Sequence, residues 1–250
     1  MSSTKIELDE VKLLCGAPIY FQDICYIFQP TIRDIGNISY SKFKEYLYVF
    51  IADPKTAYDI KDQVDPFYFM LIMCETNPKF YRLVKEAFKF FTHEDILVIK
   101  EFNGIQVGNN IGKDKLITRD NFPEFQYILK KLHCYDCEDK YTEPENERAR
   151  KIIEKLKKSQ DIVSQIKNKR NEDSDEVDFS SLISSLGLYY RDLSKVLDLS
   201  YYAFFDQVKR MQVKEEYDTN LKSALAGAKI PKNKMKYWIR KIHQTDKGGN

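Results

Sequence analysis

The densest group of potential metal ligands in the sequence is a short run after the middle of the chain. His133, Cys134 and Cys137 lie within five residues, and the two cysteines have the spacing found in zinc ribbons. A structural zinc takes four such ligands, and no second Cys or His pair completes the set. We therefore expect a helix end with a partly buried thiol here, and no metal.

Two other segments resemble ligand-binding patterns without matching them. Residues 53–65 contain four aspartates but lack the alternation and the central glycine of a calcium loop. Glycines recur every four residues from Gly104 to Gly112, yet Lys113 is followed by Asp114, where a nucleotide P-loop requires Ser or Thr. With only 3 histidines, few bases could activate a cysteine nucleophile. We accordingly predict no cofactor and no enzymatic activity.

Composition and charge limit the classes of partner. The chain has 250 residues, of which 40 are basic and 38 acidic, and the resulting net charge of +2 disfavours a dedicated surface for nucleic acid. The longest apolar run, at residues 67–74, is far shorter than the roughly 20 residues of a membrane helix. The 5 cysteines fit reduced core residues. We expect a soluble intracellular protein, with no nucleic acid and no membrane as partner.

The first part of the chain, residues 1–142, is predicted to be an α+β domain. Aromatic and β-branched runs at 12–20 and 23–28 fit a small hairpin, and Asn103-Gly104 between apolar residues is a strong signal for a second one. A third short strand is expected at 116–118. Apolar residues at helical spacing and capping signals predict helices at 31–35, 40–52, 66–75, 78–91 and 122–132.

Residues 143–178 are predicted to connect two folded units. A long charged helix at 144–170 has a narrow apolar seam, and an acidic, hinge-like link follows at 171–178. The seam either packs against the protein's own domains or binds a partner. It consists of Ile152, Ile153, Leu156, Val163 and Ile166.

The last part, residues 179–250, is predicted to be a small helical bundle with a basic tail. Separate helices are expected at 201–213 and at 217–226, and Pro231 precedes a last helix that contains Tyr237 and Trp238. Phe204 and Phe205 either belong to the core or face a partner. The basic terminus is either a solvated tail or a contact for phosphate or an acidic partner. The predicted fold class is thus α+β and mostly helical.

The order of several amphipathic segments resembles a known family. The segments are QPTIRDIG at 29–36, YSKFKEYL at 40–47, ENERARKI at 145–152, LDLSYYAFFDQVKRM at 197–211, YDTNLKSALAGAKI at 217–230 and YWIRKI at 237–242. Together they resemble the tail assembly chaperones of long-tailed bacteriophages and prophages of Gram-positive bacteria. The resemblance covers most of the chain and includes no catalytic signature.

This resemblance implies a non-enzymatic protein of the host cytoplasm. Such a protein binds the tape measure protein and recruits tail tube subunits until the tail polymerises, and self-association is a further alternative. The candidate partner-binding residues are Ile152, Ile153, Leu156, Val163, Ile166, Phe204, Phe205 and Trp238. The rival hypotheses are a structural tail or baseplate component of the phage particle and a DNA-binding regulatory protein.

Overall fold

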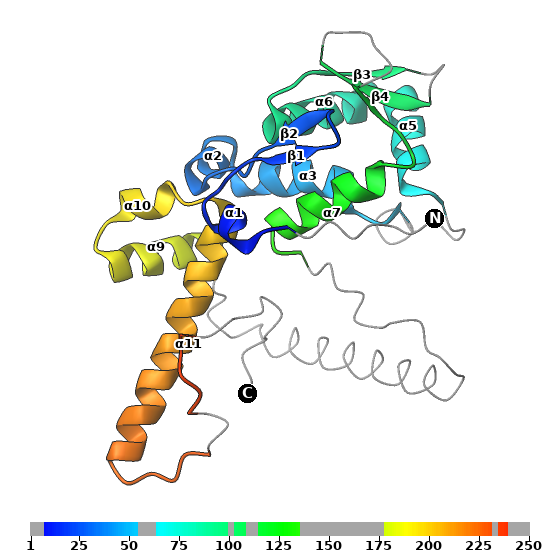
Figure 1. Cartoon of the computed structure of the whole chain (residues 1–250). Helices are drawn as coiled ribbons and strands as arrows, with labels where there is room; N and C mark the ends of the chain where they lie inside the picture. Colours follow the sequence, from blue (N-terminus) through cyan, green and yellow to red (C-terminus); the bar gives the residue numbers. More distant parts are fainter. Residues whose placement is uncertain are drawn as a thin grey trace, which may run out of the picture.

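The computed structural model describes residues 8–54, 64–99, 103–108, 115–135, 178–231 and 235–239. Helices dominate the fold, and two small antiparallel sheets accompany them, so the predicted α+β, mostly helical class is confirmed (Figure 1). The predicted connecting helix at 144–170 and the acidic link up to residue 177 lie outside the described residues.

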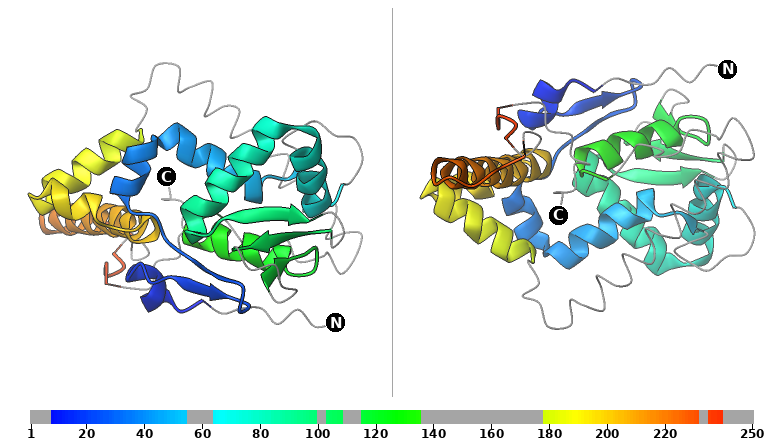
Figure 2. Two further views of the ribbon diagram at one scale, coloured as in Figure 1. Left: turned by 90° about the horizontal axis from the view of Figure 1, so that it is seen from above. Right: turned by 90° about the horizontal axis from the view of Figure 1, so that it is seen from below.

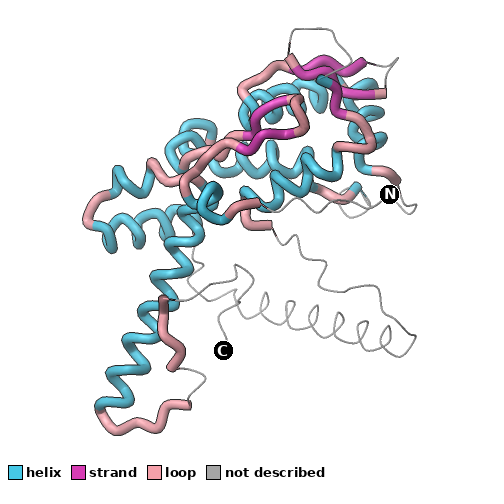
Figure 3. The backbone as a smooth tube through the Cα atoms, in the orientation of Figure 1, coloured by secondary structure: helices cyan, strands magenta, loops and turns pink. Residues whose placement is uncertain are grey.

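The described elements follow one another in this order: α1 (Glu10–Leu14), β1 (Ile19–Phe21), β2 (Cys25–Ile27), α2 (Ile32–Ile38), α3 (Tyr40–Ile51), α5 (Pro66–Thr76), α6 (Pro78–Thr92), β3 (Ile96–Ile99), β4 (Gly104–Val107), β5 (Leu116–Ile117), α7 (Phe122–Leu132), α9 (Phe179–Tyr190), α10 (Leu193–Leu197) and α11 (Tyr201–Leu225). Figure 3 shows the strands as two separate small groups among the helices.

Local capping explains where several helices begin. Thr31 and Asp34 form a reciprocal capping box at the start of α2, which satisfies two backbone N–H groups. Asn77 accepts hydrogen bonds from the first turn of α6, and Pro78 occupies the first position of that helix. Helix α1 is a correction, because the residues from 12 onward were expected to be extended. Asp9 caps α1 by accepting a hydrogen bond from Val11 N at 2.8 Å.

The two sheets confirm both predicted hairpins. Strands β1 and β2 pair antiparallel, and β4 lies between β3 and β5 in the other sheet. At the β3–β4 turn Asn103 has φ +44°, and Ile99 pairs with Gly104. A side chain at 104 would come within 3.0 Å of the Ile117 carbonyl oxygen, so the close approach of β5 requires glycine there.

Aromatic side chains fill the core between α3, α6 and α7. Phe50, Phe88 and Phe125 are fully buried, and their ring centroids lie 5.4 to 6.3 Å apart. The β1–β2 hairpin joins this core because Phe28 N donates a hydrogen bond to the Phe91 carbonyl oxygen at 2.7 Å. Large, fully buried rings at this spacing contribute contact energy beyond their burial.

The C-terminal helices differ from the prediction in two respects. Residues 201–225 form one helix, α11, where two were expected, and residues 235–239 are not helical. The interval at 214–216 contains no Gly or Pro, and the (i, i+4) ion pair between Lys214 and Asp218, at 2.6 Å, spans it. The ring of Tyr237 instead packs edge-on against Tyr217 of α11 at 5.6 Å.

Backbone hydrogen bonds and ring contacts join the C-terminal helices to the N-terminal elements. Ile32 N donates to the Leu199 carbonyl oxygen and Tyr201 N donates to that of Pro30, both at 3.0 Å. The rings of Tyr40 and Phe179 stack with centroids 4.1 Å apart. Figure 2 shows α9, α10 and α11 together at one side of the molecule, with β3, β4 and α5 at the other.

We expect Phe204→Ala to lower the free energy of unfolding by about 3 to 5 kcal/mol, because this fully buried ring lies at the junction of α9 and α11. Chemical denaturation followed by circular dichroism measures the change. Leu225→Ala is the matched control, since its side chain is 81% exposed, and it should alter stability by no more than about 0.5 kcal/mol. Equal losses for the two variants would contradict this assignment of the core.

Candidate functional site

The potential ligand cluster after α7 is a packing site for a buried imidazole. His133 is 2% exposed, and rings of Phe43, Phe91 and Tyr201 surround it with centroids 5.1 to 5.6 Å away. Its Nδ1–H donates to the Leu129 carbonyl oxygen at 2.7 Å, while Nε2 has no hydrogen-bond partner among the described residues. Burial lowers the pKa of His133 to about 4, so the ring is neutral at physiological pH.

The other reactive groups do not converge. Within the described ranges, no group of three or more His, Cys, Asp or Glu side chains could hold a metal ion, and Cys137 lies outside those ranges. Burial raises the pKa of the Cys25 and Cys74 thiols to about 12, which keeps both protonated at neutral pH. Cys134 is half-buried.

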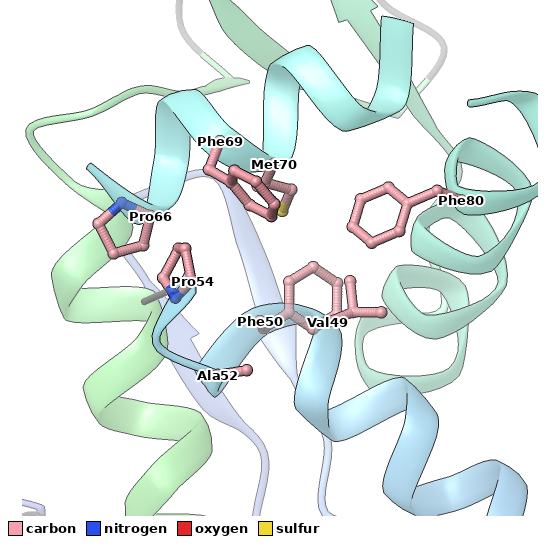
Figure 4. Close-up of a pocket in the computed structure, with 8 residues that line it drawn as sticks. All are labelled: Val49, Phe50, Ala52, Pro54, Pro66, Phe69, Met70 and Phe80. Carbon is pink, nitrogen blue, oxygen red and sulfur yellow. The ribbon is translucent and has the colours of Figure 1, made fainter. Parts of the chain in front are cut away.

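Two of the hollows in the described surface lie beside α3 and α6. Figure 4 shows one between α3, α5 and α6, where Phe50, Met70 and Phe80 surround a space of about 20 Å³, enough for about one water molecule. A larger open hollow of about 620 Å³ lies beside Phe28 and His93. Two charged residues that line it are already engaged, because Glu86 lies 3.9 Å from Lys42 and Lys89 lies 3.1 Å from Asp95.

The strongest candidate for a functional surface is the outer half of α11. Tyr201, Phe204 and Val208 bury the first two turns in the core. Beyond Val208 the helix continues away from the body, and the chain then turns back along it (Figure 1). We call residues 212–231 together with 235–239 the distal arm. None of its residues belongs to the buried core, and Leu225, Tyr237 and Ile239 are more than half exposed.

Apolar side chains of the distal arm follow one edge of α11. Tyr217, Leu221 and Leu225 are spaced four residues apart, which places them on the same face of the helix. Leu221 is 36% exposed and Leu225 is 81% exposed. From the returning segment, Tyr237 packs on Tyr217 and Trp238 lies beside Lys214, whose Nζ is 6.0 Å from the ring centroid.

A second group of exposed apolar residues lies where α9 turns into α10. Leu188 and Leu193 are exposed, as is Tyr189. Tyr190 OH donates to Gln207 Oε1 at 2.7 Å and thereby links this corner to α11. Gly187 permits the turn, because a side chain there would lie 2.9 Å from the Leu193 side chain. The C-terminal helices thus expose apolar groups at both the corner and the distal arm.

The structure separates the predicted partner-binding residues into three groups. Phe204 is fully buried and therefore has no surface to offer a partner, and Phe205 is half-buried against Phe179 and Tyr201. Trp238 lies half-exposed on the distal arm. The predicted seam lies outside the described residues; it comprises Ile152, Ile153, Leu156, Val163 and Ile166.

Sequence reasoning missed Leu221 and Leu225 as surface residues. Their helical spacing had assigned them, with Ala224, to the inward face of a bundle helix. The spacing itself is correct, but none of the described helices covers Leu225, which is 81% exposed. One signal in the sequence indicated that these leucines are exposed, namely the lysines of the surrounding segment. Lysines are mostly found at the protein surface, so an apolar stripe with many lysines around it is more often near solvent than in a core.

Comparison with known proteins relates the C-terminal part to phage proteins. Residues 167–243 match a family model described as the YomV second domain, from a phage- and prophage-associated family, which supports a phage-related protein. The match includes α9, α10, α11 and the distal arm. Neither a curated protein nor a solved structure matches the chain. No described helix is sufficiently long and apolar to span a membrane.

We expect His133 to make the protein sensitive to acid. A histidine in an unfolded chain titrates near 6.5, whereas burial holds the pKa of His133 at about 4, so the unfolded state binds the proton more tightly between these values. The free energy of unfolding should fall as the pH drops from about 6.5 to about 4. At about 1.4 kcal/mol per tenfold difference in proton affinity, the loss is on the order of 3 kcal/mol.

Urea denaturation of the wild type and of His133→Gln at pH 7 and pH 4 measures this contribution. The stability difference between the two proteins should change with pH by that amount, because the variant has no proton to bind at this position. Leu225→Ala is the control, since this exposed side chain binds no proton, and it should keep the pH dependence of the wild type. A His133→Gln variant with the same pH dependence as the wild type would refute the assignment.

Proposed function

We propose that this protein is a phage tail assembly chaperone that acts in the host cytoplasm. It binds the tape measure protein, helps to recruit tail tube subunits and catalyses no reaction. The observation that carries the proposal is the distal arm, where Leu221 and Leu225 lie exposed on a helix that begins in the core. The phage-associated family match over residues 167–243, which includes this arm, supports it.

The physical demand of tail assembly explains why such an arm is useful. A tape measure protein of the kind that the resemblance implies is long and helical, and it exposes apolar stripes until tube subunits enclose it. Uncovered stripes of this kind aggregate. A helix with its own exposed stripe can cover part of the tape measure protein by side-by-side packing, as helices do when they bind grooves and one another.

The buried first turns of α11 determine how the distal arm can act. The first turn is capped by Ser200, whose Oγ accepts a hydrogen bond from Ala203 N at 3.3 Å, and Tyr201 and Phe204 pack into the core. Because these contacts fix the start of α11, the outer half of the helix does not have to be ordered when a partner binds. This lowers the entropic cost of association. With only two exposed leucines on α11, each worth roughly 1.5 to 3 kcal/mol if fully buried, the affinity of one copy is modest and reversible.

We expect the double substitution Leu221→Asp and Leu225→Asp to reduce capture of a co-expressed tape measure protein by at least about tenfold. Two carboxylates on the stripe would have to lose water on binding, which costs more than the apolar contact contributes. Capture is measured by affinity purification of the tagged chaperone and quantification of the tape measure protein that elutes with it.

Ile72→Asp serves as the matched control, because Ile72 is an exposed apolar residue on α5, away from the C-terminal helices. This variant should capture the tape measure protein as the wild type does, and all variants should keep the wild-type circular dichroism spectrum. Undiminished capture by the double variant would remove the distal arm from the proposal. A wild type that captures no tape measure protein would refute the proposed function.

A further inference from the structure

Beyond Asp218, all charged residues of the distal arm are cations. From residue 219 to residue 245 the sequence contains no Asp or Glu, although the whole chain is nearly neutral. The same interval contains seven cations: Lys222, Lys229, Lys232, Lys234, Lys236, Arg240 and Lys241. Leu221 and Leu225 lie within this interval.

Two ion pairs lie on α11 nearer the core. Asp206 pairs with Arg210 at 2.7 Å, and Asp218 pairs with Lys214 at 2.6 Å, which raises the pKa of that lysine. Beyond Asp218 the pattern changes. Lys222, Lys229 and Lys236 are exposed and form no ion pair within the part of the chain that the structure describes.

The geometry points to a docking surface for a helical protein segment whose apolar stripe is flanked by acidic residues. This inference rests on the proposed function, and the segment is taken to be part of the tape measure protein. A partner helix that packs on Leu221 and Leu225 has flanking positions next to Lys222 of the same helix, and Lys236 directly precedes Tyr237, which packs on Tyr217. Carboxylates at those positions complete the ion pairs that the arm leaves open, as charges flanking an apolar seam do in paired helices.

The arm is less suited to a membrane or to nucleic acid. A helix that lies in a membrane interface has a broad apolar face, whereas the outer half of α11 exposes two leucines along one edge. Glu215 and Glu216 are exposed within the two turns that precede Leu221, where they would repel lipid or nucleic-acid phosphates. An acidic helix avoids this repulsion when its acidic residues lie toward the outer end of the arm.

The only tryptophan of the chain, Trp238, lies on the distal arm and gives a direct measure of binding there. The full-length protein is titrated with two synthetic helical peptides of equal length and identical leucine stripe, one flanked by Glu and the other by Lys. The Glu peptide should shift Trp238 emission and bind more weakly as salt is added, and the Lys peptide should not bind. Phosphatidylglycerol vesicles and duplex DNA are titrated in parallel.

The test variant combines Lys222→Glu, Lys229→Glu and Lys236→Glu. It should bind the Glu peptide about tenfold more weakly or worse, because three surface ion pairs are replaced by repulsion. The control variant combines Lys79→Glu, Arg82→Glu and Lys85→Glu on α6, which changes the charge by the same amount at three exposed positions. The control variant should bind the Glu peptide as the wild type does.

Three results would overturn the inference: equal binding of the two peptides, unchanged binding by the test variant, or binding to vesicles or DNA in place of the Glu peptide. Capture of the tape measure protein is measured separately with the same variants. If the wild type and the test variant capture it equally, the charge inference fails and the proposed function stands. If the wild type captures none, the proposed function fails, while the peptide titration still decides whether the arm selects acidic helices.

Discussion

The insertion of the first turns of α11 into the aromatic core is the contact on which the rest of the C-terminal structure depends. Tyr201 and Phe204 pack among rings from α3, α9 and the end of α7, and the Thr31–Ser200 bridge ties the start of the helix to the start of α2. Burial of this kind is worth several kcal/mol per ring. It holds α9 and α10 in place and gives the outer half of α11 a fixed direction.

A helix buried at one end and exposed at the other makes a surface that composition cannot reveal. The net charge of the chain is +2, yet residues 219–245 contain seven cations and no Asp or Glu. Long-range attraction depends on this local field and not on the net charge. The exposed leucines add the short-range contact. Together these two features are the basis of the docking surface proposed for the arm.

Signals that act over a few residues were read correctly from the sequence. The helix starts near Thr31 and at Asn77-Pro78 and the Asn103-Gly104 turn each depend on the backbone and on side chains within one turn, so no distant residue can overrule them. The apolar faces of α3, α6 and α7 were also correct, because their periodicity is strong. The short helix α1 was missed, since five residues give too little periodicity to detect.

The sequence by itself therefore determined the two hairpins and, apart from α1, the described helices of the N-terminal part, together with the aromatic residues that fill its core. Only the tertiary structure decided that Phe204 is buried while Leu225, on the same helix, is exposed. Both residues belong to apolar stripes of similar spacing. An apolar stripe becomes part of the core only if another element packs against it. That element comes from a distant part of the chain, so the local periodicity of the stripe does not predict it.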